Sequence, residues 1–284
     1  MISQDQIDLP HLSTWIGRET SVSDILTPEL VRRFRSTFDL SPVQADIGEK
    51  APRLIHLCLG QPGSLTSELG ADGHPRKGGF LPPVPLPRRM WASGSIAFHR
   101  DLHVGDTVRR VSRITNVTAK TGRTGPLCFI SLEHTILVDD QESLVEAQTI
   151  VYRSADEGGQ TKPAAPAEEG SRQRRMVPSA PLLFRYSAIT FNGHRIHYDR
   201  GYATSVEHYP GLVVHGPLQA TLLYNFASEI NDGIPASHFS FRSHTPLFDD
   251  DPFLLHAKQE KGRMSLWTAR AGGPVGMAAE AKWT

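Results

Sequence analysis

Three polar side chains able to transfer protons or form hydrogen bonds fall close together within the segment Leu182–Asp199. They are Asn192, His194 and His197, and the Asn192-Gly193 pair predicts a turn or loop. Histidine exchanges protons near neutral pH without strong tuning, so either imidazole could serve as a general acid or base. The alternative is a structural role, because the chain has 13 histidines and chance clustering is easy.

A helix is expected to begin a little further along the chain, at His215-Gly216-Pro217. Proline suits the first turn of a helix, and glycine lets a ligand approach the backbone closely. The free N–H groups and the positive end of the helix dipole suit a carbonyl oxygen that gains negative charge. Addition of water to an α,β-unsaturated thioester needs such a donor, a base and an acid. Gly216 is the candidate donor, whereas His215 either contacts substrate or caps and packs the helix.

The two segments NGHRIH (residues 192–197) and HGPL (residues 215–218) resemble the MaoC-like hydratase family. The resemblance is to the branch of hydroxyacyl-thioester dehydratase type 2, mesaconyl-C4-CoA (3-methylfumaryl-CoA) hydratase and itaconyl-CoA hydratase. The family motif has an Asp, one further residue, Asn-Pro-aliphatic-His, and later His-Gly-(Met or Pro)-Leu. The resemblance implies that His197 is catalytic and that the Gly216 N–H helps to form an oxyanion hole. It also implies a double hot-dog of the α+β class, with PLPRRMWASGSIAF (residues 85–98) and HVGDTV (residues 103–108) in a degenerate first hot-dog.

One departure from the family motif concerns its acidic residue, which is Asn192 in this chain. An amide exchanges no proton at neutral pH. We therefore expect Asn192 to orient water while His197 takes the water proton and returns one to the α-carbon. His194 is expected to orient the site, with shared proton transfer as the alternative. Asp199 could fix the tautomer of a histidine, or it could be a solvated loop carboxylate.

Four arginines are candidates for binding the substrate, because a guanidinium can hold a carboxylate through two hydrogen bonds. A dicarboxylic acyl-CoA would fit such a group; the alternatives are a surface position or contact with CoA phosphates. They are Arg88, Arg89, Arg185 and Arg195.

No metal and no cofactor beyond the CoA of the substrate are expected. The spacing His194-x-x-His197 is shorter than the i, i+4 pair of zinc proteases, so a metal site with His215 is disfavoured. The chain also lacks the Gly-rich phosphate-binding loops of nicotinamide and ATP enzymes.

The elements that must position these residues form two similar halves. Residues 1–154 are expected to form the first hot-dog, residues 155–181 a polar linker rich in Gly, Pro and Glu, and residues 182–284 the second hot-dog. A long surface loop within a single domain is the alternative. In the first half Thr27 and Pro28 are placed as N-cap and first residue of a helix, and alternating strands follow. In the second half the helix is expected at Pro217–Ile230, again followed by strands. A curved antiparallel sheet wrapped around one apolar helix meets both descriptions.

Composition excludes several classes of protein. The 284 residues carry a formal net charge of zero, which gives no electrostatic basis for binding nucleic acid or a membrane surface. Two cysteines in apolar runs argue against a disulfide framework, and no apolar run is long enough to span a membrane. We therefore expect a cytoplasmic enzyme, with a homodimer as an open alternative.

Three other functions stay open at this point. One is the dehydratase of fatty-acid synthesis that acts on acyl-carrier-protein substrates, and another is a non-enzymatic acyl-CoA-binding module. The third is a hot-dog thioesterase, for which Glu229 lies too late in the helix.

Overall fold

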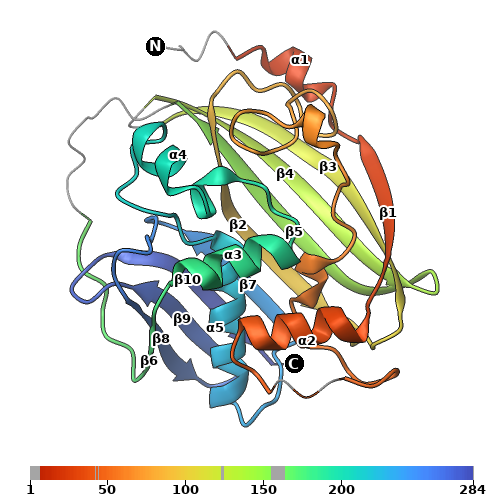
Figure 1. Cartoon of the computed structure of the whole chain (residues 1–284), viewed down its shortest axis with the longest axis vertical. Helices are drawn as coiled ribbons and strands as arrows, with labels where there is room; N and C mark the ends of the chain where they lie inside the picture. The colour runs from red at the N-terminus through yellow and green to blue at the C-terminus, as the bar shows by residue number, and fades with distance from the viewer. Residues whose placement is uncertain (1–6, 42, 44, 123–124, 155–163, 284) are drawn as a thin grey trace.

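The computed structural model describes residues 7–41, 43, 45–122, 125–154 and 164–283. The chain combines a few helices and 3-10 turns with long antiparallel strands (Figure 1). In order along the chain the elements are α1 (Leu9–Ser13), β1 (Glu19–Ile25), α2 (Pro28–Thr37), η2 (Ile55–Cys58), η3 (Thr66–Glu68), β2 (Arg88–Phe98), β3 (Thr107–Gly122), β4 (Gly125–Val138), β5 (Gln141–Arg153), β6 (Arg172–Met176), α3 (Ala180–Ile189), η4 (Arg195–His197), α4 (Arg200–Ser205), α5 (Gly216–Ile230), β7 (His238–Ser243), β8 (Phe253–Glu260), β9 (Arg263–Ala269) and β10 (Val275–Lys282).

The ten strands found among the described residues belong to one sheet in the order β1-β3-β4-β5-β2-β7-β10-β9-β8-β6. The first five positions come from the first half of the chain, and the other five come from the second half. The halves join where β2 pairs antiparallel with β7, from Ser93 opposite Arg242 to Ala97 opposite His238. Figure 1 shows the long strands of the first half and the shorter strands of the second as two curved parts of this sheet. The predicted pair of fused hot-dogs is confirmed.

The second half wraps around the helix α5, as its sequence predicts. This helix contacts β7, β8, β9 and β10, and nearly every residue from Leu218 to Ala227 is buried. Leu218, Leu223 and Ala227 are fully buried. The apolar surface of the helix is thus removed from water and packs against the concave face of the sheet. The N-terminus of α5 is thereby fixed near the seam between the halves, where β2 meets β7.

The first half has a different filling. Its predicted helix forms as α2, with the Thr27 hydroxyl accepting a hydrogen bond from the Leu30 N–H at 3.1 Å, but α2 has only 10 residues and packs against α3. The short turn η2 supplies three buried side chains, Ile55, Leu57 and Cys58, to the same core as the strand residues Phe98 and Val108. Residues of the long connection between α2 and β2 therefore fill part of the interior of the first half.

The structure corrects the extent of the predicted linker. Within residues 155–181, the segment Arg172–Met176 forms the edge strand β6, paired with β8, and α3 begins at Ala180. Residues 155–163 lie outside the described part of the chain. The sequence of β6 shows no alternation of apolar and polar residues, because its residues are almost all polar and largely exposed, as is common for strands at a sheet edge.

Two further expectations can be compared with the structure. Cys58 and Cys128 are free and buried, as expected for a chain without a disulfide framework. No helix among the described residues is long and apolar enough to cross a membrane.

Candidate active site

His197 is the last residue of η4 and is buried, with 7% of its surface exposed. Its Nδ1 lies 2.7 Å from the carbonyl oxygen of Val213, which can only accept, so Nδ1 carries the proton. The Nε2 atom is therefore left with a lone pair. Burial lowers the pKa of His197 to about 4, which keeps the ring neutral at pH 7. The side chain is thus prepared to accept a proton.

His215 holds the ring of His197 in place. It is the N-cap residue of α5, is completely buried, and stacks on His197 with centroids 3.6 Å apart and an interplanar angle of 18°. Its Nε2 is hydrogen-bonded to the Ser187 hydroxyl at 2.8 Å. Burial holds the pKa of His215 well below its usual range, so the stacked pair does not carry two like charges.

Gly216 begins α5, directly after His215. Its N–H belongs to the first turn, where amides lie ahead of the helical hydrogen-bond ladder. A Cβ atom at this position would lie 3.0 Å from Cε3 of Trp91 on β2, so the glycine permits close approach of the first half. The helix start, the indole of Trp91 and the stacked histidines therefore lie together at the seam of the two hot-dogs.

Asn192 shapes the loop that carries His194 and His197. Its side-chain oxygen accepts a hydrogen bond from the backbone N–H of His194 at 3.0 Å, and the backbone N–H of Asn192 donates to the Ser187 carbonyl at 2.8 Å. Phe191 just before it has a positive φ of 50°, which fits a tight turn after α3. The role predicted for Asn192, to orient water, would therefore fall to its amide nitrogen.

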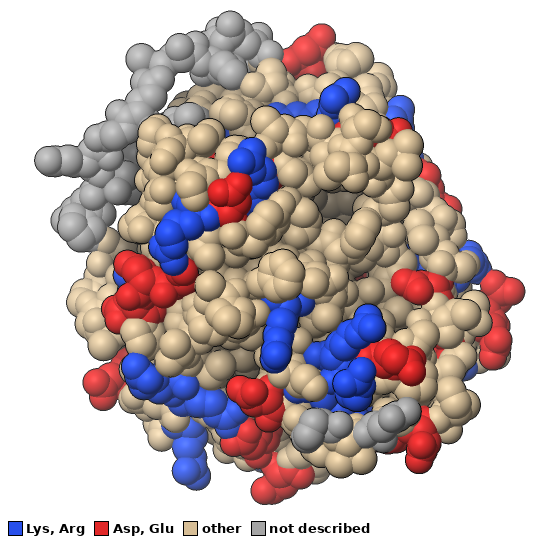
Figure 2. All heavy atoms as spheres, in the orientation of Figure 1, with Lys and Arg blue, Asp and Glu red and all other residues tan. Residues whose placement is uncertain are grey.

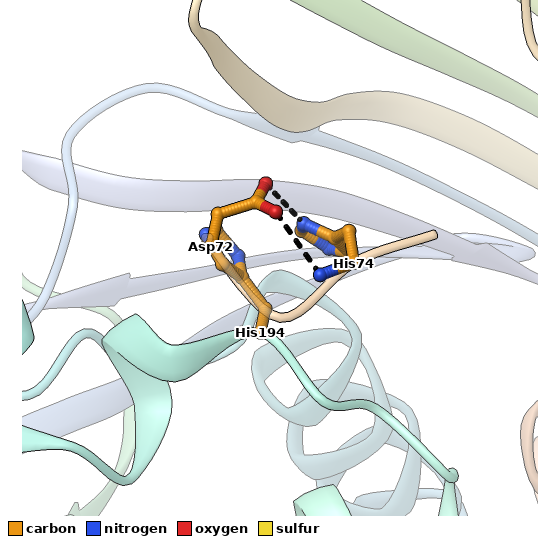
Figure 3. Close-up of side chains that lie close together, drawn as sticks. All are labelled: Asp72, His74 and His194. Atoms are coloured by element: carbon orange, nitrogen blue, oxygen red, sulfur yellow. Dashed lines mark hydrogen bonds and ion pairs between the residues drawn. The ribbon is translucent and has the colours of Figure 1, made fainter. Parts of the chain in front are cut away.

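Two residues missed in the sequence, Asp72 and His74, come from the first half and lie beside His194 (Figure 3). Asp72 Oδ2 lies 2.9 Å from His74 Nδ1, and Asp72 Oδ1 accepts the His74 backbone N–H at 3.1 Å. The rings of His74 and His194 have centroids 4.0 Å apart, and the ring of His194 meets that of His197 edge-on at 5.3 Å. Burial lowers the pKa of His74 to about 4 and that of His194 further still, with His74 and His197 adding to the latter effect.

The loop that carries Asp72 and His74 is attached directly to the loop of His197. The Arg195 N–H donates to the Asp72 carbonyl at 2.9 Å, and Arg195 Nη1 donates to the Ala71 carbonyl at 3.0 Å. A Cβ on Gly73 would lie 1.9 Å from the Gly193 carbonyl oxygen, and one on Gly193 would lie 2.7 Å from the Gly73 carbonyl oxygen. Only two glycines allow this backbone contact. The site is therefore built by both halves of the chain.

The four arginines differ in their surroundings. Arg88 is buried and binds Glu207, through Nε to Oε2 at 3.0 Å and through Nη2 to the carbonyl at 2.6 Å. Arg185 is exposed on α3. Arg195 is bound to Asp199 and to the first-half loop. Arg89 is half-buried, and its positive charge contributes to lowering the pKa of Asp72, His74 and His194.

Asp199 does not hold a histidine. Its Oδ1 caps α4 by accepting the Tyr202 N–H at 3.0 Å, and its Oδ2 accepts two hydrogen bonds from Arg195 at 3.0 and 2.7 Å. The expectation that Asp199 fixes a tautomer is corrected, since the Val213 carbonyl does this for His197. Nothing in the sequence singles out that carbonyl, because any backbone oxygen could serve.

A cleft of about 740 Å³ lies next to this cluster. It is lined by the loop of Asp72, by the first residues of β2 and by α4, and its cations include Arg76, Lys77 and Arg89. Figure 2 shows that the face seen in Figure 1 is hollowed and carries both signs of charge without one dominating. More cationic than anionic side chains line this cleft, which favours an anionic ligand.

Asp72, His74 and His194 also offer ligand atoms that all lie within 4.8 Å of one another, a set that could hold a metal ion. Two observations weigh against that use. Both carboxylate oxygens of Asp72 already accept hydrogen bonds from His74. The positive charge of Arg89 acts on all three residues and opposes a further dication.

The chain is similar in sequence to known hydratases and dehydratases. Residues 54–249 match the model of the family hydroxyacyl-thioester dehydratase type 2. The chain is 42% identical over 270 residues to mesaconyl-C(4)-CoA hydratase of Chloroflexus aurantiacus, covering 93% of this chain and 94% of that protein. It is 27% identical over 217 residues to the mitochondrial hydroxyacyl-thioester dehydratase type 2 of Schizosaccharomyces pombe, covering 68% and 72%.

Solved structures show the same fold at low sequence identity. A MaoC-like dehydratase from Phytophthora capsici superposes with a TM-score of 0.73 at 14% identity, with 98% of each chain covered. HtdX of Mycobacterium tuberculosis gives a TM-score of 0.69 at 17% identity, covering 94% of this chain and all of that one. The fold, together with the family match over most of the chain, places this protein in the hydroxyacyl-thioester dehydratase type 2 family.

Proposed function

We propose that the protein catalyses the reversible addition of water to the double bond of an α,β-unsaturated acyl-CoA. The observation that carries this proposal is the neutral, buried imidazole of His197, whose Nδ1–H is held by Val213 and whose Nε2 is left to accept a proton. The ring of His197 stacks on that of His215, the residue directly before α5. A base and an oxyanion donor are two of the groups that this reaction requires, and an acid that protonates the α-carbon is the third.

The chemical steps follow from that arrangement. His197 Nε2 takes a proton from water while the water oxygen bonds to the β-carbon of the substrate. The electrons of the double bond move onto the thioester oxygen, where the Gly216 N–H and the dipole of α5 stabilise the negative charge. Protonation of the α-carbon then gives the 3-hydroxyacyl-CoA. The reverse sequence removes water.

The acyl group that fits best carries its own carboxylate. Arg89 is half-buried, lines the cleft and acts electrostatically on His194. A second carboxyl group a few atoms from the thioester would lie within its reach and would balance its charge. The relative from Chloroflexus aurantiacus is named for such a substrate, mesaconyl-C4-CoA. Arg76 and Lys77 in the cleft are available for the phosphates of CoA.

The test is the loss of enoyl-thioester absorbance with mesaconyl-C4-CoA, itaconyl-CoA and crotonyl-CoA. We expect the dicarboxylic thioesters to be hydrated fastest. Arg89→Met should raise KM for them by about 10- to 100-fold, the range for losing a hydrogen-bonded ion pair, and should leave crotonyl-CoA unaffected. Arg185→Met, on an exposed helix position, is the matched control.

Two outcomes would contradict the proposal. A preference for crotonyl-CoA by orders of magnitude would remove the carboxylate-binding role of Arg89. Release of free thiol with the double bond intact would identify a thioesterase instead.

CoA is part of the substrate, and the proposed steps need no separate cofactor. Full activity after dialysis against a chelator would agree with this, and activity that returns only with added metal would contradict it. A homodimer and a cytoplasmic location stay predictions. Sedimentation and cell fractionation test them.

A further inference from the structure

The loop of His197 lacks the second proton-transfer group that its family motif supplies. Asn192 stands at the acidic position, and its side-chain oxygen is bound to the His194 N–H. A carboxylate does reach the site, but from the first half of the chain. Asp72 is held against the same loop through the hydrogen bond between its carbonyl and the Arg195 N–H.

Four imidazole rings form a row that ends at this carboxylate. His215 stacks on His197 at 3.6 Å, His197 meets His194 at 5.3 Å, and His194 meets His74 at 4.0 Å between centroids. Asp72 closes the row at His74 Nδ1, 2.9 Å away. Because the carboxylate fixes the proton on Nδ1, the Nε2 of His74 has its lone pair available. The His74 side chain is 19% exposed and accessible to a small ligand.

His74 has an anionic hydrogen-bond partner, whereas the hydrogen-bond partner of His197 is neutral. A protonated His197 would be backed only by the neutral Val213 carbonyl and the neutral ring of His215. A protonated His74 would form an imidazolium–carboxylate pair with Asp72, the arrangement that stabilises the histidine of a hydrolase triad. Asp72 would therefore stabilise a positive charge formed on His74 during turnover.

We propose that His74 is the second proton-transfer residue of the site and that Asp72 positions it. This inference rests on the proposed function. In hydration, His197 Nε2 takes a proton from the attacking water and releases it to solvent, while His74 Nε2, protonated from solvent, gives a proton to the α-carbon of the enolate. In dehydration His74 takes the α-proton and releases it to solvent, while His197 Nε2 gives a proton taken from solvent to the leaving hydroxyl group. Both histidines begin and end each turnover neutral.

The test separates the two ends of the row by isotope exchange. Purified full-length variants are incubated in D2O with the hydration product made by the wild type, and the entry of deuterium at the α-carbon is followed by NMR. Loss of water is followed by absorbance. Losing a general acid–base group should cost about 10²- to 10⁴-fold.

His74→Gln should lose both exchange at the α-carbon and dehydration by that factor. His197→Gln should lose dehydration but keep exchange within about 10-fold of the wild type, since proton abstraction at His74 does not require it. Asp72→Asn should reduce exchange with little change in KM, because it acts through His74. His238→Gln, at an exposed position outside the site, is the control and should match the wild type.

The wild-type hydration rate measures the proposed function, whereas the exchange rates of the variants measure this inference. Near-normal exchange in a folded His74→Gln variant would overturn the inference. Equal loss of exchange and dehydration in His197→Gln would also overturn it, in favour of a single base at His197. Stoichiometric zinc that is lost from Asp72→Asn and required for exchange would overturn it in favour of a metal centre.

Discussion

Gly73→Ala should impair catalysis far more than it destabilises the fold. Gly73 has φ = 85°, a conformation that costs an L-residue about 1–2 kcal/mol. Its new Cβ would lie 1.9 Å from the carbonyl oxygen of Gly193, and because that atom belongs to the backbone the loop must move by about 1 Å or more to reach an ordinary contact. The hydrogen bond from the Arg195 N–H to the Asp72 carbonyl would then break.

The displacement separates the first-half loop from His194 and His197. A misplacement of about 1 Å can cost about 100-fold in rate, so we expect kcat to fall by that order. Gly17→Ala is the matched control, because Gly17 has the same φ of 85° and its Cβ would meet nothing within 4 Å. Urea unfolding should show a similar loss of stability in both variants, and hydration kinetics should separate them. If Gly73→Ala keeps the kcat of Gly17→Ala, the first half does not help to build the site.

Three other perturbations have defined outcomes. Burial lowers the pKa of His197 from 6.5 to about 4, so protonation favours the unfolded chain. The free energy of unfolding should therefore decrease as the pH falls from 6.5 toward 4, by about 2 kcal/mol at pH 5. His197→Gln should flatten this pH dependence in urea unfolding, and an unchanged dependence would contradict the lowered pKa of His197. Arg88→Met leaves the carboxylate of Glu207 without its cation, which should lower the free energy of unfolding by about 3 kcal/mol and leave KM nearly unchanged. A decrease below about 1 kcal/mol, or a large rise in KM, would count against a structural role for Arg88. Gly216→Ala places a Cβ 3.0 Å from the Trp91 ring. The helix start must move to relieve this contact, which shifts the Gly216 N–H and should lower kcat about 10-fold. A wild-type kcat would show that this N–H is not the oxyanion donor.

The features predictable from sequence were those set by neighbouring residues. Thr27 caps its helix because a hydroxyl before Pro28 can reach an amide three residues on, which is a local matter. The segment from Asn192 to His197 and the start of α5 at Gly216 are likewise short patterns, and they lie in contact as the motif implies.

The contribution of the first half could not be predicted in this way. Asp72 and His74 lie in a stretch of glycines and polar residues that indicates only a turn, and their meeting with His194 depends on tertiary contacts across more than a hundred residues. The two-glycine contact at Gly73 and Gly193 becomes visible only when both loops are in place. The two roles left open for Asp199 could not be separated from the sequence, because proximity in sequence did not reveal its hydrogen bonds to Arg195.

Hydration kinetics of His197→Gln test the central claim most directly. We predict that the variant binds a non-hydrolysable thioether analogue of mesaconyl-C4-CoA with nearly the wild-type Kd, because the ring contributes to chemistry rather than to binding. We predict a kcat lowered by about 10²- to 10⁴-fold, the range for losing a general base. A folded His197→Gln variant that hydrates mesaconyl-C4-CoA at the wild-type rate would contradict the claim that His197 is the base of this site.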